Sequence, residues 1–176
     1  PVNRAPIAAA DKTASMDEDA INTALNISAP SDADGDSLTI TVTAVPTGGT
    51  LTMADGTEVT INSTLTISQL TGLVFTPDAN LNDDNTTFGT FTYTVSDGSL
   101  SDTGKVTISV TPVNDAPELP DPNLSIDENH ADVVAMGVTD VDGDTLTYSI
   151  SGGDDQALFE IDASTGTLSF INRPDY

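Results

Sequence analysis

Two short segments of the chain are rich in closely spaced aspartates, whose carboxylates can ligate metal ions. Each segment places three aspartates at alternate positions: Asp32, Asp34 and Asp36 in the first, and Asp140, Asp142 and Asp144 in the second. Alternate carboxylates can converge on one point if the loop curls, and Ca²⁺ accepts six to eight such hard oxygen ligands in irregular geometry. Gly35 and Gly143 give the backbone freedom for a tight bend within each segment.

A simpler interpretation also fits these segments, because an Asp/Gly turn can keep its carboxylates in water. The segments are not EF-hands, since the glycine falls at loop position four instead of six and no glutamate stands at position twelve. However, each triplet recurs with an upstream glutamate, Glu18 or Glu128, and with the linker residues Asn114 and Asp115. Hard-cation sites need converging oxygens, so the joint recurrence of these acidic clusters favours metal binding.

The composition of the chain restricts its partners. There are 28 acidic residues against 4 basic ones, which gives a formal net charge of −24, so nucleic acid and anionic membrane surfaces would repel it. Either the acidic surface is simply solvated, or many of its carboxylates ligate divalent cations. Cysteine is absent, which excludes disulfides and thiolate metal sites. No segment is long and apolar enough to predict membrane insertion.

The chain repeats itself at a spacing of about 110 residues, a usual size for one domain. The matched segments are residues 3–6 with 114–117, residues 17–19 with 127–129, residues 31–39 with 139–147, and residues 49–52 with 166–169. We therefore predict one module over residues 1–113 and the N-terminal part of a second, truncated module over residues 114–176.

Alternation of apolar residues with Thr or Ser predicts half-buried β-strands. It occurs in residues 38–43, 91–95, 106–110 and 146–150. Asp-Gly and Gly-Gly turn signals separate these runs, and only residues 68–72 could form a single helical turn. The pattern predicts an all-β sandwich. Because Trp is absent and aromatic residues make up 5%, we expect a core of Val, Ile, Leu and Ala.

Five characteristic motifs lie in the second copy, at residues 127–129, 140–142, 159–162, 165–168 and 174–176, with residues 95–98 in the first copy and the linker 113–117 beside them. Through these motifs the chain resembles bacterial cadherin-like modules, which occur in tandem in large RTX-type adhesins exported by type I secretion. The resemblance implies tandem cadherin-like, Ig-like Greek-key β-sandwiches, of which the second is incomplete.

The resemblance also implies Ca²⁺ at the junctions between modules. The candidate ligands are Glu18, Asp32, Asp34, Asp36, Asp97, Asn114, Asp115, Glu128, Asp140, Asp142, Asp144 and Asp175. Of these, Glu18 and the linker residues would serve the same junction as the second triplet, and the first triplet would serve a preceding junction with Asp97. Pro112 stands where the family's linker often carries an Asp, which could remove one ligand.

These observations predict a Ca²⁺-binding extender module of a bacterial surface adhesin, located outside the cell, with adjacent repeat modules as its partners. The alternative is an adhesive module that binds a polysaccharide or another adhesin. We do not expect an enzyme, because the single histidine, His130, lies in a polar stretch and no nucleophile or phosphate-loop motif occurs. A glycosidase carboxylate pair would need a sugar cleft, and the aromatic residues follow the strand pattern instead.

Overall fold

The computed structural model describes residues 2–120 and 134–172. The chain divides into two compact units, Pro1–Val113 and Asn114–Tyr176, which we call unit 1 and unit 2. That unit 2 is the first part of a second cadherin-like module stays a prediction. Among the described residues, no helix is long and apolar enough to cross a membrane.

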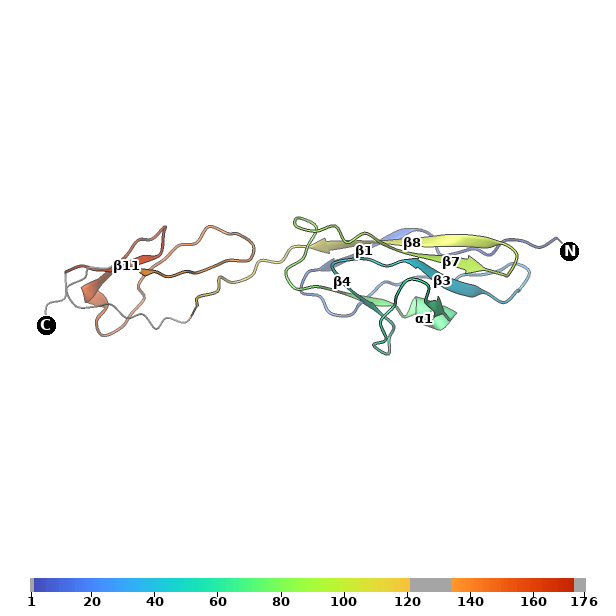
Figure 1. Cartoon of the computed structure of the whole chain (residues 1–176), viewed down its shortest axis with the longest axis horizontal. Helices are drawn as coiled ribbons and strands as arrows, with labels where there is room; N and C mark the ends of the chain where they lie inside the picture. Colours follow the sequence, from blue (N-terminus) through green and yellow to red (C-terminus); the bar gives the residue numbers. More distant parts are fainter. Residues whose placement is uncertain (1, 121–133, 173–176) are drawn as a thin grey trace. The chain divides into compact units, whose positions relative to one another are not determined.

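Unit 1 is a β-sandwich with one short helix, which confirms the all-β prediction (Figure 1). Its elements are β1 (Lys12–Asp17), β2 (Thr23–Ala24), β3 (Thr39–Ala44), β4 (Gly49–Thr52), β5 (Thr64–Leu65), α1 (Ile67–Thr71), β6 (Val74–Pro77), β7 (Thr90–Ser96) and β8 (Ser101–Thr111). One sheet has the strand order β1-β8-β7-β3-β5 and the other β2-β6-β4. The N-terminus and the end of β8 lie at opposite ends of unit 1, so each end can carry its own set of polar side chains.

Alternating side chains build the core of unit 1. Along β7, Phe91, Tyr93 and Val95 are buried, whereas the Thr and Ser residues between them are only partly covered. This is the period of two that a half-buried strand requires. The expected absence of aromatic residues from the core is wrong, because the four largest fully buried side chains are Tyr93, Phe75, Phe88 and Phe91. Few aromatic residues are present, but unit 1 concentrates half of them in its core.

Helix α1 confirms the predicted helical turn near residues 68–72. Thr66 caps it: its hydroxyl accepts a hydrogen bond from the Gln69 N–H, and the Gln69 side chain accepts one from the Thr66 N–H. Such a reciprocal pair satisfies two of the free donors at a helix start. Leu70 is the buried residue of the helix, and it anchors the helix to the core.

Gly104 leaves the space that Tyr93 fills, because the two residues face each other across β7 and β8. A Cβ atom at residue 104 would collide with Cζ and Oη of Tyr93. We therefore expect Gly104→Ala to destabilise the chain by about 1–3 kcal/mol through overpacking. Urea denaturation followed by circular dichroism measures this. Gly152→Ala, at a position with open space, is the control, and equal effects of the two changes would contradict the packing argument.

Unit 2 contains β9 (Val134–Ala135), a 3-10 helix (Gln156–Leu158), β10 (Phe159–Ile161) and β11 (Thr167–Phe170). Its sheet order β10-β11-β9 matches β4-β6-β2 of unit 1, so β11 corresponds to β6 and β10 to β4. A hydrogen bond from Met136 N–H to Gly166 O repeats the one from Leu25 N–H to Leu73 O. The predicted match of residues 166–169 with 49–52 is therefore wrong, because Gly49 begins β4, whereas Gly166 precedes β11, the counterpart of β6.

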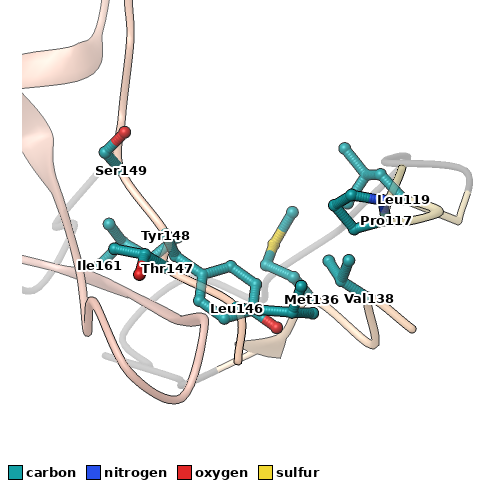
Figure 2. Close-up of a pocket in the computed structure, with 9 residues that line it drawn as sticks. All are labelled: Pro117, Leu119, Met136, Val138, Leu146, Thr147, Tyr148, Ser149 and Ile161. Carbon is teal, nitrogen blue, oxygen red and sulfur yellow. The ribbon is translucent and has the colours of Figure 1, made fainter. Parts of the chain in front are cut away.

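The predicted strand over residues 146–150 is also wrong, since these residues form no strand although their alternating burial persists. In unit 1 the corresponding strand β3 pairs with β7 and β5, and unit 2 has no such strands among its described residues. An apolar hollow of about 300 Å³ lies instead beside this segment (Figure 2). Met136, Leu146 and Tyr148 are among the residues that line it. The described part of unit 2 thus has one three-stranded sheet and no partner strands for this segment.

Candidate metal sites

The two acidic triplets fold in the same way in both units. In unit 1, Oδ1 of Asp32 accepts hydrogen bonds from the N–H groups of Asp34 (2.8 Å) and Asp36 (3.3 Å). In unit 2, Oδ1 of Asp140 accepts them from the N–H groups of Asp142 (3.0 Å) and Asp144 (3.1 Å). The first aspartate of each triplet thus closes the turn that the predicted Asp/Gly pattern indicates.

The second aspartate of each triplet binds the segment that precedes its unit's first strand. The N–H of Arg4 donates to Oδ2 of Asp34 at 2.8 Å, and the N–H of Asp115 donates to Oδ2 of Asp142 at 2.7 Å. Isolated β-bridges extend both contacts, Ile7 with Ser31 and Glu118 with Thr139. In each unit, the segment before the first described strand is thus hydrogen-bonded to the acidic triplet.

Asp97 joins the first triplet through the N-terminal segment. Its Oδ2 accepts a hydrogen bond from Nδ2 of Asn3 at 2.9 Å, and Asn3 is the neighbour of Arg4, which binds Asp34. The N–H groups of Leu100 and Ser99 hold Oδ1 of Asp97 and lower the pKa of this carboxyl group below its ordinary value. Asp97 is therefore negatively charged at neutral pH. We call Asn3, Asp32, Asp34, Asp36 and Asp97 the N-terminal cluster.

Glu18 lies at the other end of unit 1, just after β1, and only 3% of its surface is exposed. Its Oε1 accepts a hydrogen bond from the N–H of Val113 at 2.7 Å, and its Oε2 accepts one from Nδ2 of Asn82 at 3.0 Å. Asn82 is 5% exposed and belongs to the loop between β6 and β7. We call Glu18, Asn82 and Val113 the C-terminal cluster.

Asn82 is not among the predicted ligands, although its loop also carries three aspartates, Asp78, Asp83 and Asp84. Asn82 is 64 residues away from Glu18, so no local sequence pattern indicates that the two side chains are buried together. The structure shows Asp83 in a structural role, because its Oδ2 accepts hydrogen bonds from the Ser109 hydroxyl and the Val110 N–H.

The donor chemistry of both clusters fits a hard divalent cation. All candidate side chains offer oxygen, and Oδ2 of Asp32 is buried without a hydrogen-bond partner among the described residues. Both hydrogen bonds to the buried Glu18 carboxyl group come from neutral donors, the Val113 N–H and the Asn82 amide. Within the described ranges, however, no three His, Cys, Asp or Glu side chains come together as a metal cage. The described side chains of each cluster are thus too few to complete a metal site on their own.

The remaining predicted ligands give less information. Asn114 is exposed, and its Nδ2 donates to the carbonyl oxygen of Asp115 at 3.0 Å. Asp36 and Asp144 are exposed and enter the loops through their backbone N–H groups. Glu128 and Asp175 lie outside the described residues, as do the flanking motifs 127–129 and 174–176.

The strand order, the paired Asp turns and the end clusters define a cadherin-like, Ig-like β-sandwich. The chain belongs to the bacterial Ig domain family, whose model matches residues 3–109. Such domains are typically extracellular, non-enzymatic modules of the adhesion type. No curated protein matches the chain.

Solved cadherin structures share this fold. Mouse cadherin-23 EC22-24 is 20% identical with a TM-score of 0.52, and the match covers 97% of this chain and 55% of that one. Human protocadherin-24 EC1-2 is 20% identical with a TM-score of 0.55, covering 97% and 81%. Protocadherin gamma C5 EC1-3 is 19% identical with a TM-score of 0.54, covering 97% and 58%. The chain thus spans about half the length of the cadherin-23 fragment. At these identities the likeness concerns the fold alone.

Proposed function

We propose that the chain is a Ca²⁺-binding extender of a bacterial surface adhesin of the RTX type. The observation that supports this most is the buried carboxylate of Glu18, whose two hydrogen bonds come from neutral donors. Burying a charge is unfavourable unless an opposite charge or strong hydrogen bonds compensate for it. A bound divalent cation would provide that compensation.

The residues proposed to hold Ca²⁺ form sets at the two ends of unit 1 and at the start of unit 2. Glu18 would serve one set, Asp32, Asp34, Asp36 and Asp97 another, and Asn114, Asp115, Asp140, Asp142 and Asp144 a third, with Glu128 and Asp175 as further candidates. When bound, Ca²⁺ supplies positive charge and accepts six to eight oxygens, including water and backbone carbonyls. Partial sets on consecutive modules could therefore share an ion.

The mechanical role follows from charge. Carboxylates gathered at the junction between two modules repel each other in a chain of net charge −24, so the junction should be mobile without a cation. Binding to the ordered junction stabilises it by about 2.7 kcal/mol at a hundredfold excess of ion over the dissociation constant. Extracellular modules bind Ca²⁺ at about 10⁻⁴ to 10⁻³ M. A chain of this kind would stay loose in the cytoplasm and stiffen after export, with the adjacent modules as its partners.

Small-angle X-ray scattering of the 176-residue chain tests this role. We expect the maximum dimension of the chain to increase and the distribution of interatomic distances to narrow as Ca²⁺ is added. The midpoint of this change should fall at a Ca²⁺ concentration of about 10⁻⁴ to 10⁻³ M. The reason is that an ion shared by ligands of consecutive modules would restrict the motion of the linker. Equal concentrations of Mg²⁺ provide the control, because Mg²⁺ screens charge equally but demands a smaller octahedral site. Identical scattering profiles in Ca²⁺ and in chelator would refute the proposed role.

A further inference from the structure

Glu18 and Asn82 are the polar side chains buried in unit 1, and they are buried against each other. Glu18 follows the edge strand β1, whereas Asn82 stands in the loop between β6 and β7. A polar group of this kind is retained in a core only where it is satisfied by hydrogen bonds. Their 3.0 Å hydrogen bond therefore links two distant segments at the end of unit 1 from which the chain leaves.

Asn82 is held in place by its own loop. Its Oδ1 accepts a hydrogen bond from the N–H of Asp84 at 3.0 Å, and its N–H donates to Oδ1 of Asn85 at 3.1 Å. Its carbonyl oxygen accepts hydrogen bonds from the N–H groups of Asn85 and Thr86. With these bonds made, Nδ2 of Asn82 is left to donate to Glu18, and its direction is set by the loop.

The loop is in turn attached to the end of β8. Asp83 donates its N–H to the carbonyl oxygen of Val110 and accepts hydrogen bonds from the Val110 N–H and the Ser109 hydroxyl. Glu18 itself holds the next part of the chain, because its Oε1 accepts the N–H of Val113. The carboxylate of Glu18 is therefore oriented from two sides, by the loop and by the exit of β8.

Such an arrangement leaves Glu18 able to bind a cation. An ionised carboxylate has about four lone-pair sites, so one hydrogen bond to each oxygen leaves acceptor capacity on both. The amide of Asn82 is neutral and donates, so it neither repels the carboxylate nor competes as a charge. An aspartate at residue 82 would place a second negative charge about 3 Å from Glu18 and would remove the donor.

We infer that Asn82 is a positioning residue for the calcium ligand Glu18, an inference that rests on the proposed function. Asn82 acts through Glu18: it orients the carboxylate before the ion arrives and thereby sets the affinity of this site. Residues that orient metal ligands in this way typically contribute about 10- to 100-fold to metal affinity.

Isothermal titration calorimetry of the calcium-free 176-residue chain with CaCl₂ tests the inference. We expect Asn82→Ala to weaken the Glu18 site about 10- to 100-fold. Thr87→Ala is the matched control, because Thr87 is an exposed residue of the same loop and belongs to neither cluster. Its affinity should stay within about twofold of the unchanged chain.

A double-mutant cycle separates positioning from a merely structural role. If Asn82 acts through Glu18, adding Asn82→Ala to Glu18→Gln should change the affinity no further. Circular dichroism at the titration temperature checks folding, and any variant that is partly unfolded is titrated again in sucrose, which favours the compact state.

The outcomes distinguish the two proposals. If the unchanged chain binds no Ca²⁺, the proposed function fails and the inference fails with it. If the unchanged chain binds but Asn82→Ala binds equally well, the inference alone is overturned. The inference alone is also overturned if Asn82→Ala weakens Ca²⁺ binding as much in a chain that carries Glu18→Gln as in a chain that retains Glu18. A loss that is confined to the chain with Glu18 supports the inference.

Discussion

Glu18→Gln is expected to remove most of the stabilisation that Ca²⁺ gives the chain through the site that contains Glu18. At a hundredfold excess of Ca²⁺ over the dissociation constant, binding raises the free energy of unfolding by about 2.7 kcal/mol. Glutamine keeps the size of Glu18 but lacks the negative charge and one acceptor oxygen. If the dissociation constant rises about 100-fold, the stabilisation falls to about 0.4 kcal/mol. Urea denaturation in Ca²⁺ and in chelator measures the difference for each variant.

The informative quantity is the free energy of unfolding in Ca²⁺ minus the free energy of unfolding in chelator. Glu18→Gln also changes the calcium-free chain, because Val113 and Asn82 donate to both oxygens of Glu18. Subtracting the chelator value removes this effect. Glu58→Gln is the control, since Glu58 is exposed and belongs to neither cluster. Should Glu18→Gln retain the full stabilisation by Ca²⁺, Glu18 would not be a ligand.

Phe91→Ala is expected to lower the free energy of unfolding by about 3–5 kcal/mol, the usual effect of deleting a fully buried aromatic ring. Phe91 is fully buried in β7, lies opposite Val106 of β8, and stacks on Tyr93 with ring centroids 5.5 Å apart. Its removal would leave a cavity in the middle of the larger sheet. Stacked aromatic pairs add about 0.5–1.5 kcal/mol beyond their buried area.

Thermal and urea denaturation in chelator measure the effect of Phe91→Ala without a contribution from Ca²⁺. Ile61→Ala is the control, because Ile61 is a large apolar residue that is 53% exposed. It should change stability by less than about 0.5 kcal/mol. An effect of Phe91→Ala below that of the control would mean that β7 does not form the centre of the core.

The local pattern was sufficient for the strands that it predicted in unit 1. Residues 91–95 and 106–110 became parts of β7 and β8, because a period of two defines both a strand and its buried face. The repeated Asp-x-Asp-Gly-Asp segments likewise predicted two equivalent turns, since an aspartate side chain can accept the N–H two residues ahead. These are short-range properties, and the order of residues determines them directly.

The same pattern failed at residues 146–150, where the alternation is present but no strand forms. A strand needs partners, and in unit 1 these come from β7 and β5, which follow β3 at a distance along the chain. The match of residues 49–52 with 166–169 failed for a related reason. Similar short sequences occur in several strands of a sandwich, and only the sheet order tells which strands correspond.

For the candidate sites, the order of residues was enough to identify oxygen-rich acidic segments that repeat at the module spacing. It did not indicate which of these residues meet. In the folded chain the N–H of Arg4 donates to Asp34, Nδ2 of Asn3 donates to Asp97, and Glu18 is buried against Asn82. Burial and hydrogen bonding between residues far apart depend on how the sheets pack, which no local spacing specifies.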